Sequence, residues 1–222
     1  MKIRIAILSL TILCLALSAP VFAGTLYNDG PTDGYTNSLI IDGPGGVFGQ
    51  TISDGFVATN SGLAVSFDAA EWVTAGSTPT ALTWMLGSSA FGSNLGSGSG
   101  IDSFTFFASN SYGYDVYIDH VTGLSAALTA GNTYWLTLGG GTDSSGGIYD
   151  GWDLNNGPAT CEWAVGGVPQ GGCGYGGESF TINGPGPGTP EPSSILLFGS
   201  GILGSVSYTH LDVYKRQLFQ NV

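Results

Sequence analysis

Apolar and polar residues alternate along the middle of this chain with a period of two, whereas an amphipathic helix repeats every three to four residues. The segment 63–68 shows the pattern clearly, because each apolar residue is followed by a small or polar one. Further strands are expected at 81–86, 103–107, 114–119, 133–138, 161–165 and 178–182, with weaker candidates at 38–41 and 55–58. Turn-forming Gly, Asn, Asp and Pro residues separate them. The pattern predicts an all-β chain with a single antiparallel β-sandwich, jelly-roll-like, over residues 24–183.

The first 23 residues are typical of a secretory signal peptide. A positive start with Lys2 and Arg4 precedes an apolar run over 5–19, and Pro20-Val21-Phe22-Ala23 follows. Positive, apolar and small-residue regions in this order predict export and cleavage after Ala23. The alternative is an uncleaved anchor, but the apolar run is short for a bilayer span, which needs about 20 residues.

A second processing signal is expected near the other end. Residues 184–193 form a linker rich in Pro and Gly that contains Pro190-Glu191-Pro192, and an apolar, glycine-spaced segment occupies 194–205. This order resembles the PEP-CTERM sorting signal of exosortase-processed proteins, in which a Pro-Glu-Pro motif precedes a short membrane helix and a basic cluster. The apolar segment is too short to span a bilayer and no basic cluster follows it, so we interpret it as a truncated transmembrane segment. The alternative is a proline linker before a buried strand.

Residues 206–222 are interpreted as a non-native tail. The segment 206–217 reads VSYTHLDVYKRQ. It back-translates into a DNA string that, with CT before it, is its own reverse complement. Such a string resembles two transposon mosaic ends joined head to head, of the kind used to fragment DNA for sequencing. The native sequence after Ser205 is therefore expected to differ.

Charge is distributed very unevenly along the chain. The four basic residues are Lys2, Arg4, Lys215 and Arg216, whereas 15 of the 16 acidic residues precede residue 206. A domain without cations cannot neutralise phosphates, which excludes nucleic acid as a partner and disfavours an anionic membrane surface. Aromatic residues make up 12% of the chain, and this content favours a folded domain over a disordered one.

Two cysteines remain after signal-peptide cleavage, Cys161 and Cys173. Export leads to an oxidising compartment, so a disulfide between them is expected. The alternative is a metal-binding pair, but no histidine lies near them in the sequence.

Two loops offer oxygen ligands for calcium, which takes six to eight of them from carboxylates, carbonyls and water. One loop spans Asp29–Asp33, and the preferred one contains Asp143, Asp150 and Asp153 with glycines between them. A site requires that the three carboxylates of the preferred loop converge on one point. The alternative is that these are ordinary solvated turn residues. No other cofactor is indicated.

Trp152, Tyr149 and Asn155 form a candidate sugar-binding patch, flanked by Asp150 and Asp153. An aromatic face beside short amide and acidic side chains suits the recognition of polyols. The alternative is that Trp152 belongs to the core, which is the commoner place for tryptophan.

The sequence carries no catalytic motif, and we expect a non-enzymatic protein. His120, which we expect in a turn after Asp119, is the one histidine of the central region, and no Gly-x-Ser-x-Gly elbow or zinc motif is present. A glycoside hydrolase needs only two carboxylates, so that class stays open as an alternative.

The order of short motifs is similar to that of a domain common in PEP-CTERM proteins of unassigned function. The matching segments are Thr25–Pro31, Gly113–Tyr117, Leu128–Leu136, Trp152–Pro158 and Glu178–Phe180. The resemblance implies a β-sandwich, an exosortase-type processing enzyme as a partner and a transient anchor in the inner membrane. It implies an exported cell-surface or exopolysaccharide-associated structural or interaction protein, in an extracellular or biofilm setting. The alternatives are a carbohydrate- or calcium-dependent binding module and, less favoured, a secreted glycoside hydrolase.

Overall fold

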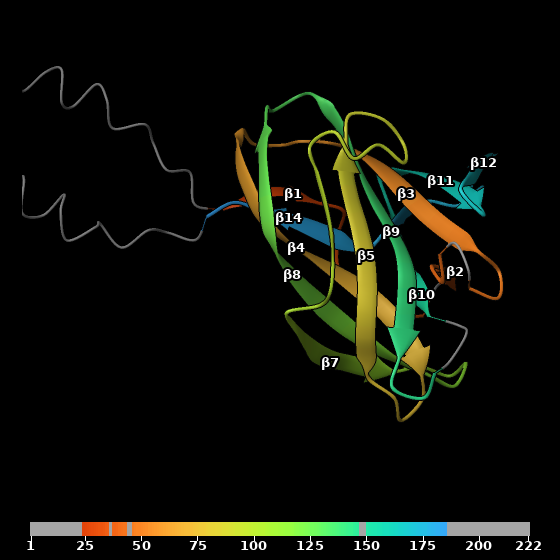
Figure 1. Cartoon of the computed structure of the whole chain (residues 1–222). Coiled ribbons are helices and arrows are strands. Elements are labelled where there is room, and N and C mark those ends of the chain that lie inside the picture. Colours follow the sequence, from red (N-terminus) through yellow and green to blue (C-terminus); the bar gives the residue numbers. More distant parts are fainter. Residues whose placement is uncertain (1–23, 36, 44–45, 147–149, 186–222) are drawn as a thin grey trace, which may run out of the picture. The chain divides into compact units, whose positions relative to one another are not determined.

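The computed structural model describes residues 24–35, 37–43, 46–146 and 150–185. In these ranges the chain forms fourteen β-strands in two antiparallel sheets and contains no helix (Figure 1). The all-β prediction is confirmed at this level. The predicted signal peptide, the Pro-Glu-Pro motif, the apolar segment 194–205 and the tail lie outside the described residues. No helix in the described part of the chain is long and apolar enough to cross a membrane.

The eight-stranded sheet is built around β4 and β8, the two longest strands. Its members are β1 (Thr25–Asn28), β2 (Asn37–Ile40), β4 (Gly62–Thr74), β7 (Ser103–Ser109), β8 (Tyr114–Leu128), β10 (Gly151–Gly157), β13 (Gly177–Glu178) and β14 (Phe180–Asn183). One edge of β4 pairs with β8, which in turn pairs with β7, and the other edge pairs with β14 and β10. Strand β1 then pairs with β14, and the Gly184 N–H donates to the Gly24 carbonyl at 2.9 Å.

The six-stranded sheet has the order β12-β11-β3-β9-β5-β6. Its members are β3 (Gln50–Val57), β5 (Pro79–Gly87), β6 (Gly96–Ser99), β9 (Thr133–Asp143), β11 (Thr160–Val165) and β12 (Val168–Gly172). Strands distant in the sequence lie side by side here, because β3 pairs with both β9 and β11.

The two sheets pack face to face in a β-sandwich-like arrangement through a shared apolar core. Phe56 of β3 meets Phe180 of β14 edge to face at 5.5 Å, and Phe67 of β4 meets Trp84 of β5 in the same way at 6.0 Å. Each contact joins one sheet to the other. The alternation in the sequence thus directs every second side chain into the space between the sheets.

The predicted strands lie almost wholly within observed ones, but one predicted segment is divided and four observed strands were not predicted. The segment predicted at 178–182 is divided at Ser179 into β13, which pairs with β10, and β14, which pairs with β4. Strands β1, β6, β10 and β12 were not predicted, because they are short or rich in Gly, Asn and Asp, which disfavour strands. Tertiary pairing overrides this local preference.

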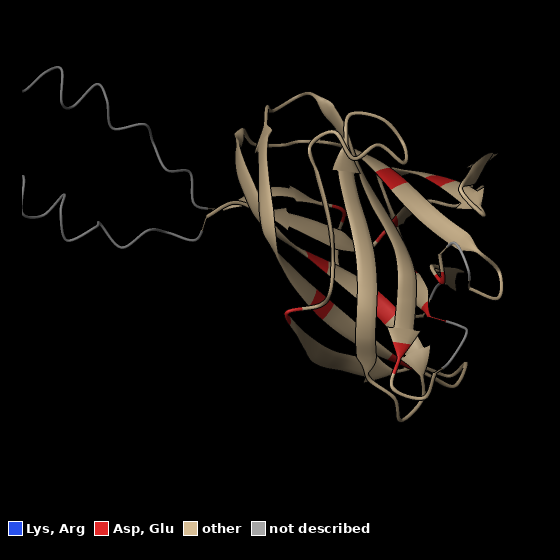
Figure 2. Ribbon diagram, viewed as in Figure 1, with Lys and Arg blue, Asp and Glu red and all other residues tan. Residues whose placement is uncertain are grey.

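Negative charge is concentrated inside the molecule. Eight acidic residues of the described ranges are buried: Asp29, Asp54, Glu71, Asp119, Asp143, Asp150, Asp153 and Glu178. Figure 2 shows acidic residues along the strands and no Lys or Arg among the described residues. Buried carboxylates are normally paired with cations or donors. The distribution therefore differs from the solvated turn residues that the sequence analysis offered as an alternative.

Candidate functional site

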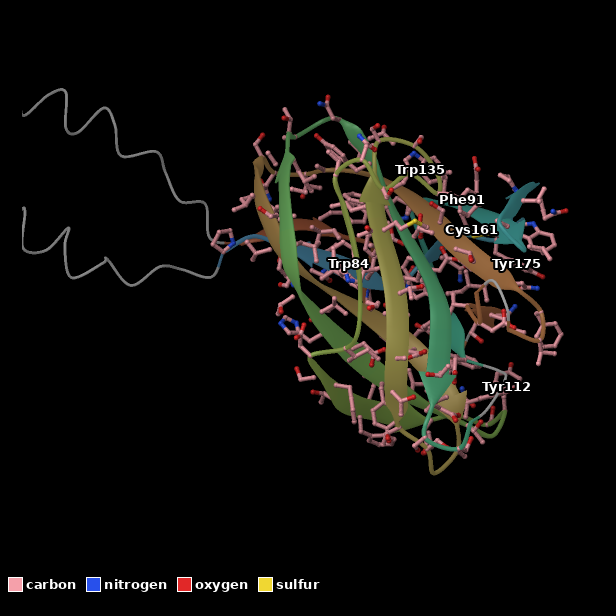
Figure 3. The ribbon with its side chains drawn as sticks, viewed as in Figure 1. Trp84, Phe91, Tyr112, Trp135, Cys161 and Tyr175 are labelled. Atoms are coloured by element: carbon pink, nitrogen blue, oxygen red, sulfur yellow. A yellow bond between two sulfur atoms is a disulfide. The ribbon has the colours of Figure 1, made fainter. Side chains whose placement is uncertain are left out.

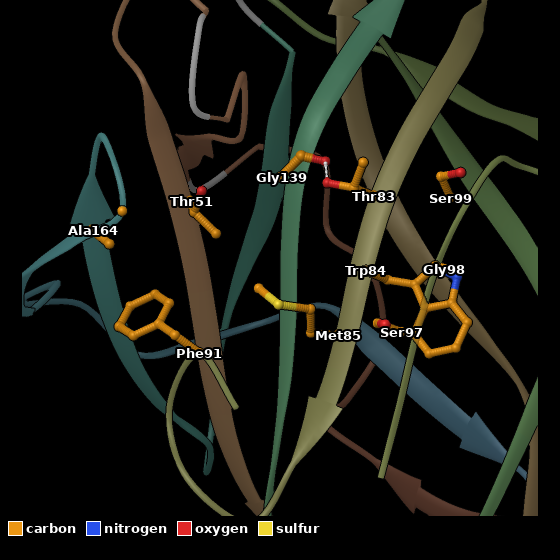
Figure 4. Close-up of a pocket in the computed structure, with 11 residues that line it drawn as sticks. Thr51, Thr83, Trp84, Met85, Phe91, Ser97, Gly98, Ser99, Gly139 and Ala164 are labelled. Atoms are coloured by element: carbon orange, nitrogen blue, oxygen red, sulfur yellow. Dashed lines mark hydrogen bonds between the residues drawn. The ribbon is translucent and has the colours of Figure 1, made fainter. Parts of the chain in front are cut away.

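A groove crosses the outer face of the six-stranded sheet (Figure 4). Ala164 pairs with Thr51 at one side, and Gly139, Thr83 and Ser99 continue the same row over β9, β5 and β6. A Cβ on Gly139 would lie 3.1 Å from Thr51 Oγ1, so the missing side chain leaves this hydroxyl uncovered by β9. Since neighbouring strands lie about 4.8 Å apart, the row gives a flat floor roughly 19 Å long.

Phe91, on the connection between β5 and β6, forms a wall of the groove. Its φ angle is +58°, a conformation that costs a bulky residue of order 1–3 kcal/mol. The Phe91 N–H donates to Ser53 Oγ at 3.2 Å, and Ser53 Oγ lies 2.8 Å from Thr137 Oγ1. These bonds hold the strained loop against the sheet and keep the aromatic ring at the groove.

The groove is lined only by uncharged residues. They enclose about 540 Å³ and comprise Thr51, Thr83, Trp84, Met85, Phe91, Ser97, Gly98, Ser99, Gly139, Ala164 and Gly167. Thr83 Oγ1 donates to the Gly139 carbonyl at 2.6 Å, which fixes the orientation of this hydroxyl. Hydroxyl groups on a flat floor beside Phe91 and Met85 can bind a neutral polyol, and none of them is a general acid or base.

The first group of buried acids lies between the sheets near the start and end of the domain. The Glu178 N–H donates to Asp54 Oδ2 at 2.7 Å, and the two carboxyl groups lie close enough to share a proton. No other described residue donates to Asp54 Oδ1 or to the Glu178 carboxylate oxygens. Asp29 is nearby and accepts from the Tyr27 hydroxyl and, at 3.1 Å, from the Ala159 N–H. Burial raises the pKa of Asp54 to about 7 and that of Asp29 to about 6. Burial and then the Asp54 charge raise the pKa of Glu178 well above its usual value.

Cys161 and Cys173 form a disulfide with their Cα atoms 5.4 Å apart (Figure 3). Among the described residues, these sulfurs and a carboxylate oxygen of Glu178 are the one group of three such ligand atoms within 4.8 Å of one another. Because both sulfurs are bonded to each other, this group is not a metal site.

Breaking this disulfide should lower the free energy of unfolding by about 3 kcal/mol, as expected for a loop of this length. Urea unfolding of the native protein, the reduced protein and a Cys161→Ser/Cys173→Ser variant would measure it. Reductant should have no further effect on the double variant. Equal stability of native and reduced protein would contradict the expectation.

Comparison with known proteins supplies no family. No protein-family description matches the chain, and no curated protein resembles it recognisably. The site is therefore interpreted from its own geometry.

The three aspartates predicted to bind calcium together do not converge. Asp150 faces the space between the sheets, whereas Asp153 faces the other way and accepts from Trp72 Nε1 at 2.6 Å. Asp143 accepts from the Thr74 N–H at 3.0 Å and from Ser145. The predicted loop is largely strand, since β9 ends at Asp143 and β10 begins at Gly151. Residues three apart along a strand point to opposite faces, so Asp150 and Asp153 cannot share one ion.

The two aspartates of the second predicted calcium loop, Asp29–Asp33, also lie apart from each other. Asp29 lies with Asp54 and Glu178, whereas the Asp33 N–H donates to Asp153 Oδ2 at 3.3 Å. The two aspartates of this loop thus belong to different surroundings.

The predicted sugar patch is wrong in its central residue. Trp152 is 0% exposed, and its Nε1 donates to the Ser179 carbonyl at 3.1 Å. Asn155 is half-buried and donates to the Asp29 carbonyl at 2.9 Å, while Tyr149 lies outside the described residues. Trp152 pairs with Glu71 on the inward face of β10, so a sugar cannot reach it.

His120 lies within β8, where a turn was expected. Its Nδ1 is 2.6 Å from Asp68 Oδ1, and the two side chains are 40% and 34% exposed. The pair spans neighbouring strands, with Asp68 opposite His120 in the ladder. In the described part of the chain no nucleophilic side chain is hydrogen-bonded to His120, so the pair lacks the third member that nucleophilic catalysis needs.

Proposed function

We propose that this protein is an exported, non-enzymatic interaction protein of the cell surface or exopolysaccharide, with a jelly-roll-like β-sandwich that binds neutral polysaccharide. The observation that carries the proposal is the uncharged groove on the six-stranded sheet. Its floor offers the hydroxyls of Thr51, Thr83 and Ser99, and Phe91 offers an aromatic ring. Neutral sugars have hydroxyls and apolar C–H faces, and both find partners here.

Charge favours a neutral ligand over an acidic one. The described residues include no Lys or Arg, so nothing there pairs with the carboxylates or phosphates of an acidic polymer. The negative field of the domain would also repel such a polymer. The same absence of cations supports the interpretation that nucleic acid is not a partner.

The arrangement of the carboxylates supports binding rather than glycoside hydrolysis. A hydrolase needs two carboxylates that flank the substrate, about 5 to 9.5 Å apart. The groove lining includes no carboxylate. The acid beside it is Glu162, which lies opposite Ser53 and two residues from Ala164 on the same face, whereas Asp54 faces the core and is 0% exposed. A substrate in the groove would therefore meet no acid–base pair.

Export and sorting enter the proposal from the sequence. The segment 1–23 directs export, and Pro190-Glu191-Pro192 with the apolar segment 194–205 marks the chain for an exosortase-type enzyme. The protein would be held briefly at the inner membrane and then released to the envelope or extracellular matrix.

Substitution of groove residues should weaken retention by neutral polysaccharides. Affinity electrophoresis in gels containing single neutral or acidic polysaccharides would measure it. We expect Phe91→Ala to lower the affinity about tenfold, or about 1.4 kcal/mol. Thr83→Val, which keeps the shape of the strand and removes a hydroxyl, should act in the same direction.

Tyr175→Ala provides the matched control, because Tyr175 is an exposed aromatic residue outside the groove (Figure 3). This variant should migrate like the wild type. Groove variants that bind as tightly as the wild type would overturn the assignment of the groove, and a wild type retained by no neutral polysaccharide would overturn the proposed ligand.

A further inference from the structure

The second group of buried acids consists of Glu71, Asp119 and Asp150, here named the Glu71 cluster. Their exposed fractions are 2%, 0% and 1%. In the ladders of the eight-stranded sheet, Asp119 lies opposite Ala69, two residues from Glu71 on the same face. Trp152 lies opposite Glu71, and Asp150 precedes Trp152 by two residues. The three carboxylates therefore come from β4, β8 and the residue just before β10, and they share the inward face.

No described residue outside the Glu71 cluster donates a hydrogen bond to it. All six carboxylate oxygens of Glu71, Asp119 and Asp150 are buried, and Glu71 and Asp119 lie close enough to share a proton with each other. Two neighbouring acids do receive hydrogen bonds, since Asp143 accepts from Thr74 and Asp153 accepts from Trp72. The cluster is thus a local concentration of buried acceptors, whereas Asp143 and Asp153 beside it receive donors.

Nothing in the described residues neutralises this concentration of charge. They include no Lys or Arg, and His120 is bonded to Asp68 on the opposite face of the sheet. Burying an unpaired carboxylate costs several kcal/mol, so a compensating positive group is required. Either protons or a cation can supply it.

We propose that Glu71, Asp119 and Asp150 bind one calcium ion between the two sheets. Calcium takes six to eight oxygens and accepts bidentate carboxylates with irregular geometry, which fits three carboxylates whose six buried oxygens receive no donor from the other described residues. Magnesium prefers fewer carboxylates and retained waters, and zinc prefers nitrogen and sulfur ligands, which the cluster lacks.

The other sheet leaves room at this point. A Cβ on Gly141 of β9 would lie 2.8 Å from Glu71 Oε1 and 3.1 Å from the Asp150 Cβ. Any larger residue at 141 would enter the cluster. The three carboxylates do not gather within 4.8 Å of one another, so binding closes them around the ion by side-chain rotation. The bound ion then joins β4, β8 and β10 beside the end of β9.

Thermal unfolding of the purified full chain tests the proposal. Melting temperatures are compared at pH 7.5 in EDTA, in calcium chloride and in magnesium chloride at matched ionic strength. At a hundredfold excess over the dissociation constant, calcium should raise the melting temperature by about 5–10 °C, and magnesium should raise it less. Equilibrium dialysis should show one calcium ion per chain that is absent after substitution in the cluster.

Two variants locate the ion. Glu71→Gln and Asp119→Asn each remove one charge at nearly constant volume, and each should abolish the calcium shift while melting higher than the wild type in EDTA. Glu162→Gln is the matched control, because Glu162 lies on β11 in the other sheet, and it should keep the full shift.

No calcium shift and no bound ion in the wild type would overturn the proposal and leave shared protons as the means of neutralisation. An unchanged shift in both cluster variants would place the ion elsewhere and would equally overturn it. If a variant does not fold, the dialysis result on the wild type and the remaining variant decides. A calcium shift without glycan retention, or the reverse, separates this proposal from the function of the groove.

Discussion

The stability of the domain should fall as the pH rises from about 5 to about 8 when calcium is chelated. Asp54 has a pKa of about 7 in the folded protein, against 3.8 for an ordinary aspartate, and the pKa of Glu178 is raised further. The folded state therefore holds more protons than the unfolded state above about pH 4. Stability is lost at about 1.4 kcal/mol per pH unit for each proton in excess, until the pH passes the folded pKa. Urea unfolding at a series of pH values in EDTA would measure the slope.

Asp54→Asn should reduce the slope of the unfolding free energy against pH by the contribution of about one proton, or about 1.4 kcal/mol per pH unit. The variant should also stabilise the domain at pH 8. The amide removes one buried charge, keeps an oxygen for the Glu178 N–H and adds a donor for the Glu178 carboxylate. Glu162→Gln, on β11, should leave the slope unchanged. A slope that is the same in Asp54→Asn and wild type would show that the Asp54–Glu178 pair does not govern the pH dependence.

Trp152→Ala should lower the free energy of unfolding by about 3–5 kcal/mol, one of the largest effects available to a single substitution here. The indole is fully buried, lies 5.6 Å from the Phe180 ring and donates to the Ser179 carbonyl. Trp152→Phe should cost less, since it keeps an aromatic ring and loses mainly the hydrogen bond.

Urea unfolding followed by circular dichroism would measure both variants without relying on tryptophan fluorescence. Tyr175→Ala should stay within about 0.5 kcal/mol of the wild type, as expected for an exposed side chain. If Trp152→Ala were as stable as Tyr175→Ala, the burial of the indole would be contradicted.

Local alternation was enough to predict most of the strands, but the buried acids Asp54 and Glu71 lie just beyond the predicted segments 55–58 and 63–68, within the longer observed strands. In β3, Ile52 and Phe56 are core residues, and Asp54 shares their face by the period of two. In β4, Glu71 shares the face of Phe67 in the same way. The burial of both carboxylates therefore follows from the alternation only when each strand is extended to its observed bounds.

The calcium prediction failed because the chain from 143 to 153 was treated as one loop. Once Gly151–Gly157 is a strand, Asp150 and Asp153 point to opposite faces. The strand was missed because Trp152 and Leu154 are its only apolar residues, and its pairing with β2, β4 and β13 is decided by distant segments.

The groove could not have been predicted from local pattern. Its floor joins Ala164, Thr51, Gly139 and Thr83, which are far apart in the sequence, through the strand order of the six-stranded sheet. Single hydroxyl and glycine residues on separate strands carry no motif. Only the register of the ladders brings them into one row.

The pairing of β1 with β14 has a mechanical consequence. Gly24 and Gly184 are hydrogen-bonded neighbours at the same end of the antiparallel β1–β14 pair. A force that pulls these two positions apart would therefore break the hydrogen bonds between β1 and β14 one after another. A force that enters through Gly184 and leaves through the six-stranded sheet takes another path. It loads β14 in shear against β4, where several rungs must break together, and it crosses the aromatic contact between Phe180 and Phe56. We therefore expect the domain to resist less force when it is stretched from Gly24 to Gly184 than when it is held at Gly184 and loaded through the six-stranded sheet.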